Sequence, residues 1–342
     1  MVRLQSVLKT TFILSLILSC NTPQKEHQAR NIPRPSGPYL GQKSPGDEPQ
    51  LFAPGFISTA LYTRDLTMTP GGEEIYFCVS ASGFNLIFNT KQKDGYWTEP
   101  QPASFISDYN SMYYEPHITA DGRRMLFLSD MAREKGKAGN QDIRAVDRVG
   151  NAWSKPYNIG SPVNTDDAEF FPSTTRNGTL YFTRAEKGSA LHYIYRSRLI
   201  NKKYTDPERL NERVNCGANR FNAFIDPDER FVIVPAVGMA DSYGGVDYYI
   251  VFRDENDNWS KPLNMGPKIN SKNGREFSAY ISPDGKYLFF MSAKTKHAES
   301  GPLEKPTYAM LKKKHNLPQN GNADIYWIET DFIDNFKPDF RK

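Results

Sequence analysis

Short apolar segments, each preceded by a tight turn, recur along the chain. The clearest turn is Ser-Pro-Asp-Gly at residues 282–285. In such a turn Pro fixes φ near −65°, Asp bonds its own backbone and Gly takes a positive φ. The turn leads into residues 287–292 (Tyr-Leu-Phe-Phe-Met-Ser), whose aromatic and apolar side chains are typical of a buried strand. Related turns precede the apolar segments at residues 75–78, 125–129, 180–183 and 231–234.

The spacing of these turns indicates a repeat. Their fourth residues lie at positions 72, 122, 178, 229 and 285, so the steps are 50, 56, 51 and 56 residues. A period near 50 is typical of repeat architectures. In the fourth turn, Glu229 replaces the glycine.

Two further elements recur in each unit. One is a strand of the type Asp-Ile-Tyr, at residues 85–88, 142–145, 192–195, 247–250 and 324–327. The other is a Trp-Ser-x-Pro segment, at residues 97–100, 153–156, 204–207 and 259–262. With the two strands that flank the turn, each unit has four strands.

The last unit lacks its fourth strand at the C-terminal end. Residues 48–58 match residues 99–107 in their Glu-Pro-Gln start and their Ile-Ser end. A propeller removes its free sheet edges when one end of the chain completes the blade formed by the other. We therefore predict an all-β fold, a β-propeller of five four-stranded blades, in which an N-terminal strand at about 50–58 completes the last blade.

The N-terminal segment has the pattern of an export signal. Arg3 and Lys9 are basic, and residues 12–18 are apolar but too few to span a bilayer. Residues 17–20 (Ile-Leu-Ser-Cys) resemble the lipobox of bacterial lipoproteins. That resemblance implies cleavage before Cys20 and lipidation of its thiol; an ordinary secretory signal with a chance Cys is the alternative.

These features predict four regions. They are a lipoprotein signal peptide at 1–19, a flexible Pro-rich tether at 20–48 that begins with the lipidated Cys20, the β-propeller at 49–330, and a C-terminal tail at 331–342. The predicted location is the bacterial cell envelope, with the lipid anchor in the outer membrane, facing either the periplasm or the cell surface.

The repeats resemble a known family. Residues 282–290 and 324–326 are similar to the WD40-like (PD40) repeats of TolB-like β-propellers, and the resemblance extends over about residues 50–330. It implies a binding or scaffolding module of the periplasm or cell surface, although some relatives are enzymes, including oligogalacturonate lyase-like proteins. TolB itself has six blades, so the five units here depart from it.

Composition narrows the functional classes. The formal net charge is only +4, and the one long basic run is Lys312-Lys313-Lys314, so nucleic acid is not an expected partner. Cys78 and Cys216 fall in units far apart in the ring and are expected to be free thiols. No nucleophile elbow, phosphate loop or zinc motif is present.

Charged residues a few positions before each turn are the candidate site. The inner strands would bring them to one mouth of the central channel, where they could bind a ligand or form salt bridges between blades. The candidates are Arg64, Asp65, Glu115, His117, Asp167, Glu169, Arg220, Asn222, Arg275 and Glu276. Their oxygen atoms would suit calcium, but no metal site or other cofactor is predicted. Insertions at residues 131–140 and 294–321 would emerge on the same face.

Two main functions remain open from the sequence, beside a lesser one, a purely structural spacer without a concave polar pocket. The first is a membrane-anchored, non-catalytic module, expected to be a monomer, that binds an envelope protein, peptide or glycan at the channel mouth. The alternative is a carbohydrate-active enzyme, a glycoside hydrolase or polysaccharide lyase, that uses carboxylates there. If arginines hold Glu115, Glu169 and Glu276, the enzyme hypothesis weakens.

Overall fold

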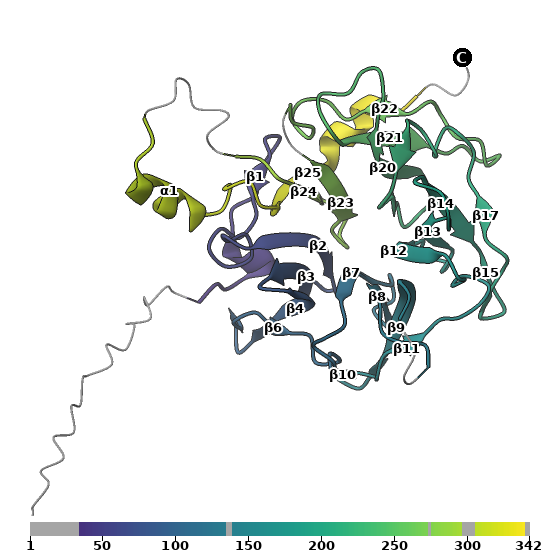
Figure 1. Cartoon of the computed structure of the whole chain (residues 1–342), viewed down its shortest axis with the longest axis horizontal. Coiled ribbons are helices and arrows are strands. Elements are labelled where there is room, and N and C mark those ends of the chain that lie inside the picture. Colours follow the sequence, from purple (N-terminus) through teal and green to yellow (C-terminus); the bar gives the residue numbers. More distant parts are fainter. Residues whose placement is uncertain (1–33, 135–138, 273–274, 296–304, 339–342) are drawn as a thin grey trace, which may run out of the picture. The chain divides into compact units, whose positions relative to one another are not determined.

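Five antiparallel sheets follow one another around a ring in the computed structural model, which describes residues 34–134, 139–272, 275–295 and 305–338. The colours in Figure 1 run around this ring in chain order. Each sheet takes its strands from one sequence repeat, except that the last sheet also includes an N-terminal strand. The predicted all-β, five-bladed propeller is therefore confirmed.

The first three blades are built in chain order from the channel outward. Blade 1 consists of β2 (Tyr62–Met68), β3 (Glu74–Ala81), β4 (Phe84–Lys93), β5 (Tyr96–Trp97) and β6 (Gln101–Pro102). Blade 2 consists of β7 (Tyr113–Ile118), β8 (Arg124–Ser129), β9 (Asp142–Val149), β10 (Ala152–Trp153) and β11 (Tyr157–Asn158). Blade 3 consists of β12 (Ala168–Thr174), β13 (Leu180–Ala185), β14 (His192–Ser197) and β17 (Glu208–Arg209), with a small hairpin of β15 (Leu199–Ile200) and β16 (Lys203–Tyr204).

The inner strand of the fourth blade is split. Blade 4 consists of β18 (Asn219–Arg220), β19 (Phe224–Ile225), β20 (Phe231–Val237), β21 (Asp247–Phe252) and β22 (Leu263–Asn264). Blade 5 consists of β23 (Glu276–Ile281), β24 (Tyr287–Ser292), β25 (Asp324–Glu329) and β1 (Gln50–Leu51).

The N-terminal strand closes the ring as predicted. In β1, Gln50 pairs with Trp327 and Leu51 pairs with Tyr326 of β25. The next residue continues this contact, because the backbone N–H of Phe52 donates to the carbonyl of Ile325 at 2.8 Å. The strand itself is shorter than expected, with only two residues.

The turns before the second strands have the expected geometry, including the one without glycine. Gly122 and Gly285 have φ values of 70° and 75°, and Glu229 adopts 60° at the same place. A positive φ is costly for a residue with a side chain. Here the Glu229 carboxylate accepts a hydrogen bond from the hydroxyl of Tyr181 at 2.6 Å, which offsets part of that cost.

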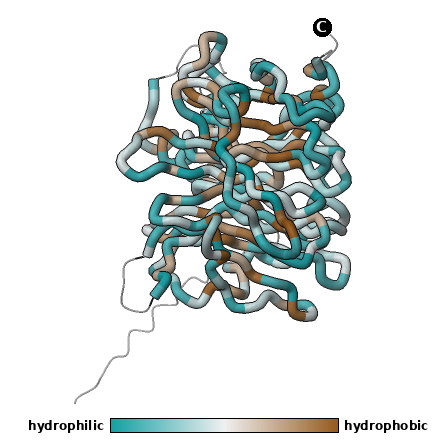
Figure 2. Tube along the Cα trace, turned by 90° about the vertical axis from the view of Figure 1, so that its right-hand side faces the viewer, coloured by the Kyte–Doolittle hydropathy of each residue, from teal (hydrophilic) through white to brown (hydrophobic). Residues whose placement is uncertain are grey.

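The core lies within and between the blades. In Figure 2 many hydrophobic stretches run through the inside of the fold, and the loops that project at its edges are mostly hydrophilic. Large aromatic side chains, such as Trp97 and Trp327, are fully buried. Cys78 and Cys216 are buried free thiols, as the sequence predicts.

Residues 34–48 differ from the tether predicted for 20–48. They include η1 (Pro38–Gly41) and pack on the propeller, because Leu40 is buried and the Tyr39 ring lies 4.8 Å from that of Tyr287. The indole N–H of Trp97 donates to the carbonyl of Gly37 at 2.8 Å. The Pro and Gly content correctly predicts an irregular segment, but it does not predict that Tyr39 and Leu40 pack against the propeller. The signal peptide, Cys20 and residues 21–33 lie outside the described residues.

The predicted C-terminal tail and the insertion of blade 5 differ in their packing. The predicted tail begins in η2 (Thr330–Phe336), which buries Ile333. The insertion at 294–321 contains α1 (Tyr308–His315), capped by the hydroxyl of Thr307 and lying beside the ring in Figure 1. No residue of α1 is buried. Residues 296–304 of this insertion and 135–138 of the other lie outside the described residues.

Candidate functional site at the channel mouth

Each inner strand carries one bulge, and the five bulges lie at equivalent places. A register shift or break interrupts every inner strand where one residue has a left-handed backbone. These five bulge residues are Asp65, Glu115, Phe171, Asn222 and Ser278, with φ between 49° and 68°. A bulge bends the strand and re-aims its side chains. All five residues are buried.

Arg64 links the first blade to its two neighbours. Its Nη2 lies 2.8 Å from Glu115 Oε1, and its Nε lies 2.7 Å from Asp65 Oδ2. The guanidinium also lies 5.3 Å from the ring centre of Tyr114 and 4.7 Å from that of Phe277. Burial would lower the pKa of Arg64, but Asp65 and Glu115 raise it above its usual value, so the group is a permanent cation.

Glu115 is the acceptor that joins the remaining blades. Its Oε2 accepts the backbone N–H of Phe171 at 2.7 Å, and its Oε1 accepts the amide of Asn222 at 3.3 Å. The same amide lies 3.4 Å from Ser278 Oγ. Burial raises the pKa of Glu115, while Arg64 opposes that rise. The five bulge residues thus meet with Arg64 in one polar network, in which Phe171 takes part through its backbone N–H. We call the polar side chains of this network the channel floor (Arg64, Asp65, Glu115, Asn222 and Ser278).

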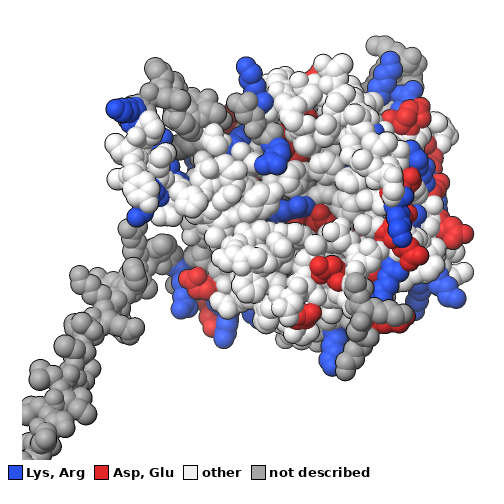
Figure 3. Space-filling model, viewed as in Figure 1, with Lys and Arg blue, Asp and Glu red and all other residues white. Residues whose placement is uncertain are grey.

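Aromatic side chains surround this floor. The aromatic collar consists of Tyr114, Phe170, His192, Phe221 and Phe277. Four of its members come directly before a bulge residue and are half-buried. Ring centres lie 5.5 Å apart for Phe170 and His192, 6.1 Å for His192 and Phe221, and 6.0 Å for Phe221 and Phe277. Figure 3 shows basic and acidic atoms together near the centre of this face, with mostly uncharged residues around them.

His117 lies deeper in the channel and has a structural partner. Its Nε2 accepts the backbone N–H of Thr174 at 3.0 Å and lies 2.8 Å from the hydroxyl of that residue. Burial lowers the pKa of His117 to about 4, so the ring is neutral at pH 7. Because its Nε2 is engaged, His117 joins blades 2 and 3 rather than serving as an accessible base.

Glu169 and Asp167 belong to the rim of blade 3. Arg184 Nε lies 2.9 Å from Glu169 Oε1, and the hydroxyl of Thr165 donates to the same oxygen at 2.6 Å. Burial raises the pKa of Glu169. Asp167 accepts the backbone N–H of Lys187 at 2.7 Å. The hydrogen bonds that these two acids accept therefore stabilise the rim loops of blade 3.

Arg220 is buried but has backbone partners instead of a carboxylate. It donates to the carbonyls of Cys216 at 2.9 Å and His192 at 3.1 Å, and also to that of Gly217. Burial lowers the pKa of Arg220. Arg275 is exposed, and its backbone forms a bridge with Val246. Neither arginine belongs to the channel floor.

Glu276 differs from the other two glutamates. Its Oε1 accepts hydrogen bonds from Ser271 Oγ at 2.6 Å and Ser292 Oγ at 2.8 Å, whereas its Oε2 has no hydrogen-bond partner within the described residues. Burial raises the pKa of Glu276 to about 7. Arginines hold Glu115 and Glu169, whereas serines hold Glu276, so the condition that weakens the enzyme hypothesis is met for two of the three.

The structure brings together only part of the predicted set. Arg64, Asp65, Glu115 and Asn222 form the channel floor, whereas the other six candidates lie deeper or at the rim. Sequence reasoning missed Ser278 and the aromatic collar. The signal was available, because the bulge residues precede the fourth residue of each turn by seven positions in every repeat.

Two features are absent from the part of the chain that the structure describes. Among the described residues, no group of three or more His, Cys, Asp or Glu side chains is placed to hold a metal ion. Within the same residues, no helix has the length and apolar character needed to cross a membrane.

Comparison with known proteins relates the chain to solved propeller structures. No protein-family model and no curated protein matches it. TolB from Acinetobacter baumannii is 13% identical with a TM-score of 0.43, over 79% of this chain and 54% of that one. The putative TolB from Agrobacterium tumefaciens is 12% identical with a TM-score of 0.44, over 78% and 90%. The GH43 BlXynB protein from Bacillus licheniformis is 12% identical with a TM-score of 0.45, over 71% and 50%.

These similarities concern the fold alone. The chain spans about half of the length of the Acinetobacter TolB. The chain's own sheets define a β-propeller of five blades, as its repeats predict, and TolB proteins are among the solved structures to which it is similar. Any ligand-binding site must therefore be inferred from the residues of this chain.

Proposed function

We propose that this protein is an envelope lipoprotein, anchored through Cys20, whose propeller binds a protein, peptide or glycan at the channel mouth without catalysis. The outer membrane is the favoured location. The observation that carries the binding proposal is the aromatic collar, which presents half-buried rings around a floor whose arginine is already paired.

Aromatic rings suit a recognition surface. They offer a large contact area with few rotatable bonds, and they are enriched where proteins bind partners. Here they lie on strands whose bulges are held by one network across all five blades, so the surface is pre-organised. A pre-organised surface loses less conformational entropy when a ligand binds.

The insertion of blade 5 offers a second contact on the same side. It leaves the sheet after β24, at the end where Ser292 pairs with Glu276. In α1, Tyr308 is 80% exposed and Leu311 is 51% exposed, next to three lysines. This combination of apolar and basic groups favours a protein partner with an acidic surface.

A thermal-shift screen tests the binding proposal. The chain from about residue 30 would be screened against glycan oligosaccharides, peptidoglycan fragments and envelope peptides. A ligand at 100 times its dissociation constant stabilises the fold by about 2.7 kcal/mol. Phe221→Ala and Tyr114→Ala should abolish the shift produced by a ligand of the mouth.

Tyr96→Ala is the matched control, because this exposed tyrosine lies in β5 at the outer edge of blade 1. It should leave the shift unchanged. A ligand whose shift survives both collar substitutions would place binding elsewhere. If no compound in the screen shifts the unfolding temperature, the search would turn to a protein partner and to α1.

One observation keeps the enzyme alternative open. A buried carboxyl group with a pKa near 7 and no arginine, as in Glu276, has the property of a general acid. If a screened glycan were cleaved and Glu276→Gln stopped the cleavage, the protein would be a carbohydrate-active enzyme. Binding without turnover would support the module.

The anchor has its own test. Lipidation requires the thiol of Cys20, so Cys20→Ala should move the protein from the membrane fraction to the soluble fraction. Unchanged partitioning would contradict the anchor and leave the binding proposal standing.

A further inference from the structure

The insertion of blade 5 forms a groove beside α1. The groove has a volume of about 780 Å³, and its apolar lining consists of Met310, Leu311, Leu317 and Pro318. Leu311 is 51% exposed and Leu317 is 49% exposed. Large apolar side chains that meet in one exposed, concave surface are typical of interaction sites. We call this surface the α1 groove.

Polar contacts hold the base of the α1 groove in place. The side-chain amide of Asn320 donates to the carbonyl of His315 at 2.8 Å and to that of Ala60 at 3.1 Å. The backbone N–H of Gln319 donates to the carboxylate of Asp324 at 2.6 Å. These contacts tie the segment after α1 to blade 5 and to the loop before blade 1, so the groove is preformed.

The helix itself lacks a packed face. It has eight residues, none of them buried, and Tyr308 at its first position is 80% exposed. A helix this short is marginal in water and normally gains most of its stability by packing an apolar face against the rest of the protein. Within the described residues, the apolar face of α1 has no such cover and is therefore available to a partner.

The charges around the α1 groove all have one sign. Lys313 and Lys314 line it together with His315, and none of its described lining residues is acidic. Within the part of the chain that the structure describes, neither these two lysines nor Lys312 has an ion pair. The helix dipole favours cations in the last turn, but it does not explain the apolar lining beside them. An apolar centre flanked by unpaired cations is complementary to an acidic surface with an apolar anchor.

We propose that the α1 groove docks an acidic amphipathic segment of a partner protein. An apolar side chain of that segment fills the groove, and carboxylates on either side of it pair with Lys313 and Lys314. The concave shape suits a protruding side chain better than the flat surface of a membrane. This inference rests on the proposed function, because it specifies the partner at the contact that α1 offers beside the channel mouth.

Fluorescence anisotropy of a labelled probe peptide tests the docking. The probe is a helical peptide with leucines at i, i+3, i+4 and i+7 and glutamates beside them. It is titrated with the full chain carrying Cys20→Ala, so that no lipid anchor contributes. We expect saturable binding that weakens as the salt concentration rises. The same peptide with lysines in place of the glutamates should not bind.

Substitutions in the groove should weaken binding of the probe. Leu311→Ala should lower the affinity by about tenfold, because it removes apolar area from the contact. Lys314→Glu should lower it by about fivefold, because it replaces an attraction by a repulsion. Ile200→Ala and Lys93→Glu are the matched controls, since both residues are exposed and lie in β15 and β4. These controls should leave the affinity unchanged.

Four results would overturn the inference. Absence of saturable binding would contradict docking, and equal binding of the lysine peptide would contradict the charge argument. If anionic phospholipid vesicles bind the chain through Leu311 and the probe does not compete, the occupant is a membrane surface. If sedimentation shows a dimer that Leu311→Ala abolishes, the occupant is a second copy of this chain.

Phe221→Ala separates this inference from the binding proposal at the channel mouth. It should keep the affinity for the probe, because Phe221 belongs to the aromatic collar. If the probe does not bind but a screened ligand still depends on Phe221, only the inference about the α1 groove fails. If the probe binds as expected and no ligand depends on the collar, only the proposal for the mouth fails.

Discussion

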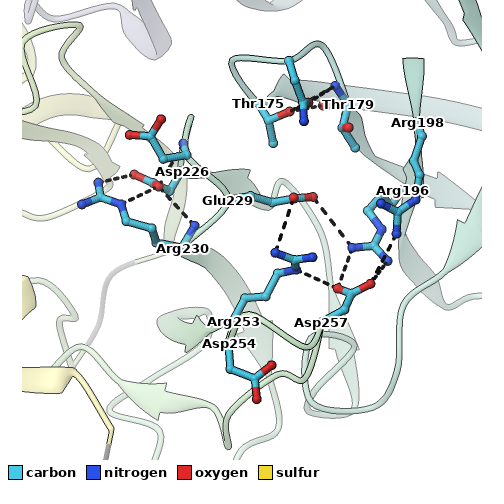
Figure 4. Close-up of polar contacts among 12 residues, drawn as sticks. Thr175, Thr179, Arg196, Arg198, Asp226, Glu229, Arg230, Arg253, Asp254 and Asp257 are labelled. Carbon is cyan, nitrogen blue, oxygen red and sulfur yellow. Dashed lines mark hydrogen bonds and ion pairs between the residues drawn. The ribbon is translucent and has the colours of Figure 1, made fainter. Parts of the chain in front are cut away.

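The channel floor and the cluster around Glu229 are two charged regions that differ in the ratio of arginines to acids. In the floor, one arginine faces two acids, whereas around Glu229 three arginines face three acids. Figure 4 shows Arg196 and Arg253 both directed toward Glu229 and Asp257. Arg196 Nη2 lies 2.7 Å from Asp257 Oδ2, and Arg253 Nε lies 2.7 Å from Asp257 Oδ1. Arg198 and Glu208 complete this cluster.

Solvent access also separates the two regions. The side chains of Asp65 and Glu115 are 1% and 5% exposed, whereas those of Asp257 and Glu208 are 34% and 50% exposed. The cluster has balanced charges even though water could screen them, and the floor is unbalanced although water is largely excluded. Because burial raises the pKa of Glu115, a proton on this carboxyl can balance the charges of the floor, whereas the cluster is balanced by ion pairs alone.

The largest effect should come from removing the central cation. Arg64→Ala leaves two carboxylates buried together and should lower the free energy of unfolding by about 3–5 kcal/mol at pH 8. The loss should be smaller at pH 5, because protonation of Glu115, whose pKa is raised, relieves the repulsion. Urea unfolding at both pH values measures this. An equal loss at pH 5 and pH 8 would show that packing, not charge, is Arg64's contribution.

The next effect concerns Glu276, a buried acid outside both regions. Its pKa of about 7 exceeds the usual 4.5, so between those values the folded state holds the proton more tightly. Stability should therefore fall as pH rises from about 4.5 to 7, by up to about 3 kcal/mol from this group. Glu276→Gln should flatten that slope in part, since Asp324 also has its pKa raised to about 7.

The control for this slope is Glu99→Gln, because Glu99 is exposed. It should leave the dependence of stability on pH unchanged. A profile for Glu276→Gln that coincides with that of the unaltered protein would contradict the role assigned to burial.

A smaller effect should separate backbone from charge at Glu229. Glu229→Gly and Glu229→Ala both remove the contacts to Tyr181 and the arginines, but only glycine tolerates the φ of 60° without strain. The alanine variant should therefore be less stable than the glycine variant by about 1 kcal/mol. Equal stabilities in guanidinium unfolding would mean that this turn relaxes when the carboxylate is lost.

The smallest effect is expected at an exposed pair. Arg176 and Asp228 lie 2.9 Å apart, with side chains 63% and 51% exposed. Arg176→Ala should change the free energy of unfolding by less than about 1 kcal/mol, and salt should weaken even that. If Arg176→Ala lowered the free energy of unfolding as much as Arg64→Ala, solvent exposure would not distinguish the two kinds of charged contact.

The sequence predicts the blades well because their signals are local. A turn such as residues 282–285 specifies its own backbone, and the apolar residues after it specify burial. The bulges are harder to foresee, since Asp65, Phe171 and Ser278 share a backbone conformation but no side-chain chemistry. Which charged residues meet in the floor depends on five such bends at once, so only four of the ten candidates converge there.

The aromatic collar was missed for a similar reason. Phe170, Phe221 and Phe277 read as ordinary core residues of strands when each is taken alone. Their shared place directly before the bulge becomes meaningful only when the repeats are aligned on the turns. Residues 34–48 show the reverse error, because Pro and Gly correctly suggested an irregular chain but gave no information about what Leu40 would cover.

The pairing of β1 with β25 has a consequence for biogenesis. Residues 50–51 are among the first of the propeller to leave the ribosome, and their partners at 326–327 are among the last. Until those partners arrive, the last blade has a free edge, and the chain is exposed to mispairing with its neighbours. Ring closure joins residues at opposite ends of the propeller sequence, so it is expected to be a late step of folding.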